Sequence, residues 1–235
     1  MPVSQLMTKL ILLIPTKGRP NNYQRLKESF ELNTHSDDNM RGPKMSSIMP
    51  VMDRFEAREY PGTGYLASKP DMNLVEKLNY AGAWAVKAQF KYIGFVGDDV
   101  VIQTPSFDKI ICEEFEADPT LKIIHCADKM HNGQIANHWV IRADVIAAVG
   151  FFALPVCKHM FIDNFWTTVG TDTESIKYLD SVMWEHLHYM NKKSAMDATY
   201  EATNNSETFK HDEVAYNEFM GGEGLVNFLK AYNNV

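Results

Sequence analysis

Short apolar runs alternate with segments of helical periodicity along the first 127 residues. The runs predict strands, which we place at 10–14, 47–52, 92–96, 100–102 and 121–127. Between them, apolar residues recur about one helical turn apart, which predicts helices at 21–32, 72–89 and 104–117. Asp71 stands where it could cap the second of these helices. The alternation predicts an α/β fold whose mainly parallel sheet carries helices on both faces.

The second half of the chain is richer in aromatic residues and less regular. Its pattern predicts a strand at 136–141, a short helix at 144–149 and a strand at 177–189. On that last strand His186 and His188 would point to one face, because side chains alternate along a strand. The tail predicts two short helices that pack on the body of the protein.

Composition sets broad limits on the function. The chain has 235 residues, of which 45% are hydrophobic and 23% charged, as in ordinary globular proteins. We expect one domain spanning 1–235. The net charge of −7 argues against broad, sequence-independent binding of nucleic acid, which needs a basic face, although a local basic cleft stays compatible with it.

Cysteine usage and the N-terminal segment point to a cytoplasmic protein. Cys112, Cys126 and Cys157 are odd in number and widely spaced, which suits neither a disulfide framework nor a zinc site, so we expect reduced core residues. Residues 1–13 hold only about five consecutive apolar residues, too few for a signal peptide or a membrane span. We therefore expect a soluble protein that does not enter a membrane.

Two adjacent carboxylates, Asp98 and Asp99, interrupt the apolar run at 92–102. They would lie near the end of a buried strand, where open α/β sheets bind ligands. Side by side, two carboxylates repel each other unless a cation or a donor lies between them. A divalent cation that bridges a carboxylate and a diphosphate would satisfy both. The alternative is a solvated Gly-Asp-Asp turn between two strands.

Three further segments offer groups for a nucleotide. The loop 15–20 holds a glycine and two cations between a strand and a helix, and Arg19 could pair with a diphosphate or stack on a base. Its glycine spacing matches neither the dinucleotide-binding nor the P-loop pattern. Asp53 ends the second strand, and Lys77 and Asn79 lie within the next helix. The alternatives are an ordinary strand–helix turn and solvated side chains.

The second half adds candidate ligands. His186 and His188 on one strand face could hold a transition metal, although a lone histidine is usually structural. Lys192 and Lys193 could neutralise a diphosphate. Trp166 belongs to an aromatic cluster that could stack on a sugar or an acceptor, the alternative being ordinary core packing.

Taken together, these residues resemble the GT-A fold glycosyltransferases over about 10–200. The resemblance implies a GT-A-like, Rossmann-type sheet flanked by helices, with a nucleotide-sugar-binding half (1–127), an acceptor and catalytic half (128–200) and a helical tail (201–235). The loop that begins with Pro15 and Thr16 looks like the opening nucleotide loop of the family. Asp53 lies where the family often holds the base. Gly97-Asp98-Asp99 stands at the place of the Asp-x-Asp metal motif, but its first position is glycine.

The resemblance also implies roles for single residues. Asp98 would bind ribose or metal, and Asp99 is the better metal ligand, completed by His186 or His188. Asp163 lies where inverting members carry the carboxylate that activates the acceptor. The cofactor implied is Mn²⁺ or Mg²⁺.

The resemblance also implies the partners. The donor would be a nucleoside-diphosphate sugar, with a UDP-sugar favoured. The acceptor would be a glycan, a small molecule or a hydroxymethylated base in DNA, the last as in phage-encoded members, which act in the host cytoplasm. Two alternatives stay open. One is a sugar nucleotidyltransferase, and the other is a non-catalytic module that binds nucleotide-sugar or glycan.

Overall fold

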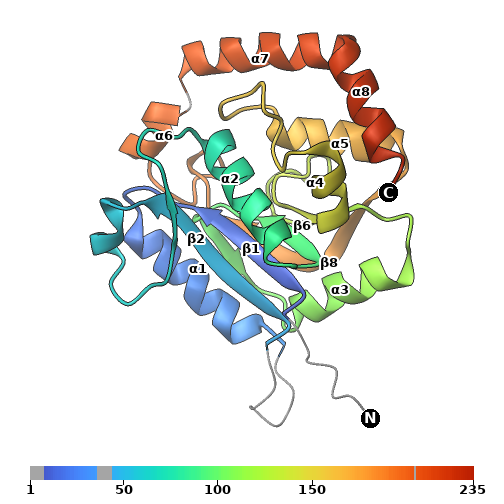
Figure 1. Cartoon of the computed structure of the whole chain (residues 1–235). Coiled ribbons are helices and arrows are strands. Elements are labelled where there is room, and N and C mark those ends of the chain that lie inside the picture. The colour runs from blue at the N-terminus through green and yellow to red at the C-terminus, as the bar shows by residue number, and fades with distance from the viewer. Residues whose placement is uncertain (1–7, 36–43, 204) are drawn as a thin grey trace, which may run out of the picture.

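The computed structural model describes residues 8–35, 44–203 and 205–235. Within these ranges eight strands form one sheet with the order β3-β2-β1-β4-β7-β6-β8-β5 (Figure 1). The strands are β1 (Leu10–Pro15), β2 (Ser46–Asp53), β3 (Leu66–Ser68), β4 (Tyr92–Phe95), β5 (Val100–Ile102), β6 (Ile123–Ala127), β7 (Trp139–Arg142) and β8 (Ile176–His186). Every strand expected from the apolar runs is present, and the α/β fold class is confirmed.

The sheet is mixed, and four of its seven pairings in the described ranges are parallel, as expected of the mainly parallel sheet predicted. β1, β2, β3 and β4 run parallel to one another, and β6 runs parallel to β8, whereas β7 is antiparallel to both β4 and β6, and β5 is antiparallel to β8. The loop between β6 and β7 contains no helix, so the chain turns back instead of crossing over to a parallel position. The predicted strand at 177–189 is bent, because its register with β6 shifts between Cys126 and Ala127.

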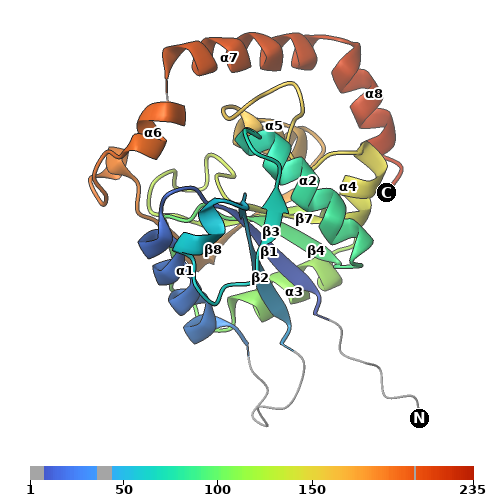
Figure 2. The same ribbon diagram turned by 60° about the vertical axis from the view of Figure 1, so that its left-hand side comes forward.

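Helices cover both faces of the sheet, which explains why the central strands are apolar throughout. They are α1 (Pro20–Asn33), α2 (Leu74–Lys87), α3 (Phe107–Ala117), α4 (Ala143–Val149), α5 (Ile162–Asp172), α6 (Ala198–Thr203), α7 (Ser206–Gly221) and α8 (Glu223–Tyr232), with single turns of 3-10 helix at η1 (Glu56–Glu59) and η2 (Tyr189–Asn191). The tail therefore forms three helices where two were expected. Figure 2 shows α1 and α3 on one side of the sheet and α2, α4 and α5 on the other.

Side chains of β1 divide between two cores. Ile11 and Leu13 pack with residues of α2, α4, α5 and α8, whereas Leu10, Leu12 and Ile14 pack with residues of α1 and α3. All five side chains are buried. Because alternate side chains anchor β1 between the two layers of helices, the position of the polar loop that follows β1 is set as well.

Local signals start the helices at somewhat different places than expected. Asn73, not Asp71, caps α2: its side chain accepts a hydrogen bond from the Glu76 N–H, and Glu76 accepts one from the Asn73 N–H. Asp71 has a positive φ of 64° and precedes this capping box. The three cysteines are buried and free, as predicted. No helix in the described ranges combines the length and the apolar character needed to cross a membrane.

One buried carboxylate helps to fasten the tail to the body. Asp212, on α7, is fully buried and accepts hydrogen bonds from the backbone N–H groups of Lys158, His159 and Met160 at 2.8–2.9 Å. Nδ1 of His211 lies 2.8 Å from the same carboxylate. Burial alone would raise the pKa of Asp212, but these hydrogen bonds outweigh it and lower the pKa. The segment that leads into α5 is thereby held against α7.

We expect Asp212→Asn to lower the free energy of unfolding by about 1–3 kcal/mol at pH 7, because an amide replaces an ionised acceptor. A carboxyl group whose pKa is lowered by folding stabilises the protein above its unfolded pKa of about 3.9 and loses that effect as the pH falls. The difference between wild type and variant should therefore shrink below about pH 4. Urea unfolding across this pH range measures it. The exposed neighbour gives a control, Glu213→Gln, and an equal loss of stability in both variants would contradict the assignment.

Candidate functional site

The polar groups of the site gather where five strands end. β1, β2, β4, β6 and β8 point the same way, as their pairings and the intervening antiparallel β7 require. Their ends therefore meet at one edge of the sheet, as ligand-binding groups do in open α/β folds. The residues that this edge carries are Thr16, Arg19, Asp53, Asp98, Asp99, Asp128, His131, His186 and His188.

Asp98 faces the loop after β1. Its Oδ2 accepts a hydrogen bond from the Thr16 hydroxyl at 2.8 Å, and an Arg19 nitrogen lies 3.3 Å from Oδ1. The Thr16 hydroxyl also lies 2.9 Å from the Tyr60 hydroxyl. Burial and the charge of Asp99 raise the pKa of Asp98 to about 7, although Arg19 and Thr16 favour its ionised form. Asp98 is therefore the member of the pair that gains a proton more readily.

Asp99 faces the end of β8. Its Oδ2 accepts a hydrogen bond from the Tyr200 hydroxyl at 2.5 Å and lies 3.2 Å from Nε2 of His186. The register explains this contact, because Val100 on β5 pairs with His186 on β8. Burial opposes ionisation of Asp99, but His186, Tyr200 and His138 outweigh it and the pKa of Asp99 is well below its usual range. The two neighbouring carboxyl groups thus have opposite pKa shifts.

Helix α6 and the residue before it cover this carboxylate pair. Arg19 donates to both oxygens of Asp197 at 2.6 and 2.8 Å, and its guanidinium lies 3.9 Å from the centre of the Tyr200 ring. The Thr199 hydroxyl donates to the Lys17 carbonyl at 3.1 Å. As a result Asp98 and Asp99 are each only 5% exposed. Figure 1 shows α6 beside the ends of β1 and β2.

A second cluster lies at the end of β2. The Ser68 hydroxyl donates to Oδ1 of Asp53 at 2.7 Å, and Nζ of Lys77 lies 3.7 Å from the same oxygen. Lys77 is buried, so its ammonium group points from α2 into this corner rather than to solvent. The structure thus brings together two of the predicted nucleotide-binding residues, Asp53 and Lys77.

Three other predicted residues are engaged elsewhere. The Asn79 amide oxygen accepts hydrogen bonds from the Phe152 and Ala153 N–H groups, and its nitrogen donates to the Ala153 carbonyl. Trp166 is fully buried and donates its indole N–H to the Phe152 carbonyl at 2.9 Å. Lys193 forms an ion pair with Glu185. These positions correct two expectations, because Asn79 clamps a loop and Trp166 packs in the core instead of offering an open stacking face. Lys192 is exposed just after η2.

Asp163 lies in the first turn of α5. Its carboxylate accepts a hydrogen bond from the Asn164 N–H at 2.9 Å. Burial raises the pKa of Asp163, against the opposing effects of that hydrogen bond and of His131 and His186. A carboxylate with a raised pKa is a stronger base than one in water, as proton abstraction requires.

The side chains that meet at Asp99 are chemically suitable ligands for Mn²⁺. A carboxylate oxygen and an imidazole nitrogen meet there, and Mn²⁺ accepts both, whereas Mg²⁺ prefers oxygen alone. Among the described residues, however, no group of three His, Cys, Asp or Glu side chains is arranged to hold a metal ion. His188 does not complete one, because its Nδ1 accepts a hydrogen bond from the Met190 N–H and its ring centre lies 5.0 Å from that of His186.

Several residues of the site had no signal in the sequence. Tyr200 and Asp197 come from the far end of the chain, and no local pattern marks them. Asn137 lies 2.8 Å from Nδ1 of His186, and the His138 ring centre lies 4.9 Å from that of His186. The only clue to these two was their place at the start of the strand predicted at 136–141.

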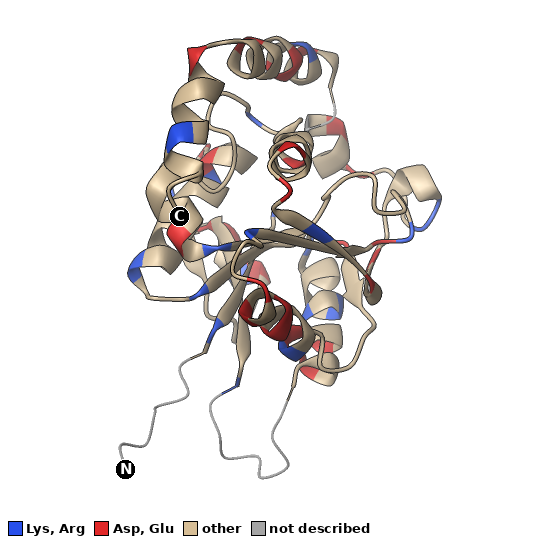
Figure 3. Cartoon of the chain, turned by 90° about the vertical axis from the view of Figure 1, so that its right-hand side faces the viewer, with Lys and Arg blue, Asp and Glu red and all other residues tan. Residues whose placement is uncertain are grey.

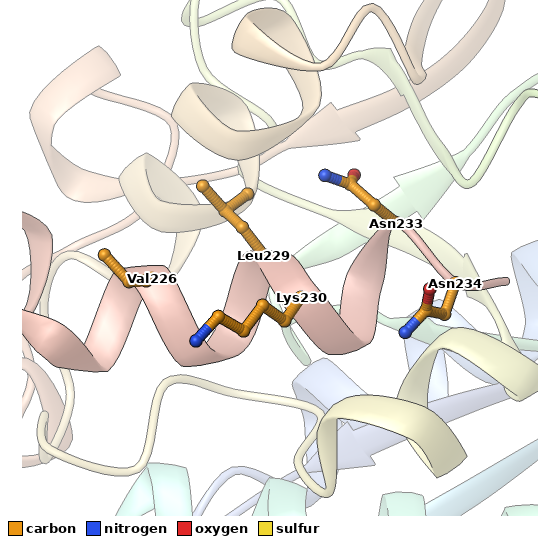
Figure 4. Close-up of a pocket in the computed structure, with 5 residues that line it drawn as sticks. All are labelled: Val226, Leu229, Lys230, Asn233 and Asn234. Carbon is orange, nitrogen blue, oxygen red and sulfur yellow. The ribbon is translucent and has the colours of Figure 1, made fainter.

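A hollow along α8 is separate from this site. It is lined by Val226, Leu229, Lys230, Asn233 and Asn234 (Figure 4). α8 lies across the molecule from α6 in both Figure 1 and Figure 2. The hollow offers neither a carboxylate nor an imidazole side chain.

We expect Asp98→Asn and Asp99→Asn to change stability in opposite directions. Folding raises the pKa of Asp98 to about 7, so its charge destabilises the protein increasingly as the pH rises from about 4 to about 7. Asp98→Asn should therefore be more stable than wild type at pH 8, by about 2–4 kcal/mol at about 1.4 kcal/mol per pKa unit. Folding lowers the pKa of Asp99, so Asp99→Asn should lose stability above about pH 4. Urea unfolding without divalent cations tests both predictions. A change in the free energy of unfolding of the same sign in both variants at pH 8 would refute the opposite pKa shifts of Asp98 and Asp99.

Comparison with solved structures identifies the fold. No family model matches the chain, and no curated protein matches it in sequence. A crystal structure of S. aureus TarS 1-349 in complex with UDP-GlcNAc is similar with a TM-score of 0.56 and 12% identity, over 96% of this chain and 72% of that one. The mannosyltransferase PcManGT from Pyrobaculum calidifontis, in complex with GDP-Man and Mn²⁺, is similar with a TM-score of 0.53 and 10% identity.

The match to the mannosyltransferase covers 77% of this chain and 57% of that one, so this chain spans under three-fifths of the length of that protein. At such identities the similarity concerns the fold. The sheet of eight mixed strands, with helices on both faces and carboxylates at the end of β4, agrees with that similarity. The chain has a GT-A-type fold.

Proposed function

We propose that this protein is a glycosyltransferase that moves a hexosyl or pentosyl group from a nucleoside-diphosphate sugar to an acceptor hydroxyl. The observation that carries the proposal is the pair Asp98–Asp99, buried at the end of β4 and contacted by Arg19 and His186. In a GT-A-type fold this combination provides groups for a diphosphate and for a divalent cation within one site. A structural turn would need neither the buried arginine nor the histidine.

On the donor side, two clusters of residues bind different parts of the nucleotide. Asp53 accepts hydrogen bonds from the base, with Lys77 beside it, and a UDP-sugar is the donor that we favour. Pro15 and Thr16 lie between β1 and α1, and the hydroxyl of Thr16 orients Asp98 toward the ribose or the metal. Arg19 leaves Asp197 and pairs with the diphosphate, for which its planar, charged group is well suited.

Asp99 and His186 would hold Mn²⁺, or Mg²⁺, which binds an imidazole nitrogen less readily. The cation would supply positive charge to the leaving diphosphate. Lys192 and Lys193 follow the same strand end and add charge for that group when Lys193 leaves Glu185. His188 lies beside the same residues and contacts Tyr200, whose ring centre lies 4.7 Å away.

On the acceptor side, Asp163 accepts the proton of the attacking hydroxyl. Its raised pKa, its place in the first turn of α5 and the electrostatic influence of His186 on it support this role. Asn79 and Trp166 take no part in the proposal, because the fold already uses their polar groups.

For the acceptor, we favour a hydroxyl of a glycan or of a small molecule over a base in duplex DNA. The net charge is −7, and Figure 3 shows blue and red segments interspersed along the ribbon. A protein that tracks a phosphate backbone needs a continuous basic surface. A hydroxymethylated DNA base is thus the acceptor that a panel should test second.

The thermal stability of the protein with nucleoside diphosphates, with and without Mn²⁺, tests the donor site. A ligand that binds only the folded state raises the melting temperature. We expect UDP with Mn²⁺ to raise it, and Asp99→Ala to abolish the part of the shift that depends on Mn²⁺, because the variant removes a metal ligand. Glu213→Gln, remote from the edge, should keep the whole shift. If no nucleoside diphosphate shifts the melting temperature of the wild type, the donor site is refuted. Release of pyrophosphate from a nucleoside triphosphate would instead favour a nucleotidyltransferase.

Asp163→Asn tests the acceptor side. We expect it to lower kcat of transfer by about 10²–10⁴-fold, the usual contribution of a general base. The melting-temperature shift with UDP and Mn²⁺ should stay as in the wild type, because Asp163 contacts neither ligand. Asn164→Ala serves as the neighbouring control. Near-normal transfer by Asp163→Asn would remove the residue from the mechanism.

A further inference from the structure

His186 is held at its backbone and at both ring nitrogens. Its N–H donates to the Asp128 carbonyl at 3.0 Å, and its carbonyl accepts a hydrogen bond from the Asn191 amide at 2.7 Å. Nε2 of the ring lies 3.2 Å from Oδ2 of Asp99. Nδ1, on the other side of the ring, lies 2.8 Å from the amide nitrogen of Asn137. The amide of Asn137 is therefore the group that meets the ring opposite the Asp99 contact.

His138 connects Asn137 back to the carboxylate motif. Nε2 of His138 lies 3.5 Å from the Asn137 amide nitrogen, and Nδ1 accepts a long hydrogen bond from the Gly97 N–H, also at 3.5 Å. The rings of His138 and His186 meet edge to face, with their centres 4.9 Å apart. The contacts thus form a closed ring that starts at Gly97 and returns to Asp99, two residues further on.

The position of the hydrogen on the His186 ring decides what Nε2 can bind. In a neutral imidazole one nitrogen donates and the other accepts. While the Asn137 nitrogen faces Nδ1, Nδ1 accepts, and the hydrogen lies on Nε2, which donates to Asp99. A nitrogen that carries a hydrogen has no lone pair for a cation. Binding of a cation at Nε2 therefore requires the hydrogen on Nδ1 and an acceptor that faces it.

Asn137 can supply that acceptor without a change of its backbone. A half turn of the amide exchanges its nitrogen for its oxygen at the place that faces Nδ1 of His186. The same oxygen would then face Nε2 of His138. In a neutral His138 ring Nε2 carries the hydrogen, because Nδ1 accepts from Gly97. The amide can thus satisfy either distribution of hydrogens on His186.

We propose that Asn137 is a positioning residue for His186, whose amide holds Nε2 toward Asp99 and turns to accept the Nδ1 hydrogen when Nε2 binds a divalent cation. The inference rests on the proposed function, since that function gives Asp99 and His186 their role toward the cation. The residues present suit this role, because a carboxylate and an imidazole would supply two ligands, and a diphosphate and water the others. Asn137 acts through His186 and need not touch the cation.

Binding of Mn²⁺ alone, followed by the relaxation of water protons, tests the effect of Asn137 on the cation. Asn137→Leu has a similar size but neither a donor nor an acceptor, and we expect the Kd for Mn²⁺ to rise about 10–100-fold. Asn137→Asp keeps an acceptor opposite Nδ1 and should not raise the Kd by more than about threefold. Gln134→Leu, exposed on the same loop, is the matched control. An unchanged Kd in Asn137→Leu, or an equal rise in Asn137→Leu and Asn137→Asp, would overturn the inference.

A second measurement needs no cation. In ¹⁵N-labelled wild type, NMR should detect a coupling across the hydrogen bond between the Asn137 amide nitrogen and Nδ1 of His186, with the hydrogen of the ring on Nε2. In Asn137→Asp, Nδ1 should gain a hydrogen, because an ionised carboxylate only accepts. A hydrogen on Nδ1 in the cation-free wild type, or none on Nδ1 in Asn137→Asp, refutes the role of Asn137. If NMR gives the expected result but the wild type binds no Mn²⁺, the cation site of the proposed function fails while the positioning of His186 by Asn137 stands.

Discussion

Two adjacent carboxyl groups, buried at the end of the central strand, are the constraint on which the site depends. Removing two like charges from water is unfavourable unless each finds a partner. The protein solves this in two ways. Asp98 is turned toward Thr16 and Arg19 and holds a proton easily, whereas Asp99 is turned toward His186 and Tyr200 and stays ionised. Since these partners lie after β1, at the end of β8 and on α6, the pair determines which distant segments must meet.

This compensation also closes the site. Arg19 touches Asp98, both oxygens of Asp197 and the face of Tyr200, so α6 is bound through the very groups that a diphosphate would use. In the proposed function, a donor would have to exchange with these contacts, because its diphosphate would replace Asp197 at Arg19 and a cation would replace the Tyr200 hydroxyl at Asp99. The free energy of donor binding would then depend on the difference between two sets of polar contacts.

Local signals in the sequence predicted most elements and part of the site. β1 and β6 are buried on both faces, so their apolar runs identify them without reference to any neighbour. The antiparallel insertion of β7 and the bend of β8 depend on pairing between distant segments, which periodicity does not encode. The same holds for side chains. Asp98 and Asp99 could be identified because they are neighbours in the sequence, whereas Tyr200, which contacts Asp99, is about a hundred residues away. The binding roles suggested for Asn79 and Trp166 are not supported, because a polar residue can equally well hold a loop and an aromatic residue can equally well pack in the core.

Gly97 explains how the motif differs from the Asp-x-Asp form. A Cβ at this position would lie 2.6 Å from Oδ1 of Asp99, so any larger residue would push that carboxylate from its present place. With glycine there, Asp99 can turn back against its own strand and reach His186. Asp98 is then left free to face Arg19. The glycine at the first position of the motif and the opposite orientations of Asp98 and Asp99 thus belong together, and in the proposed function Asp99 would face the metal and Asp98 the nucleotide.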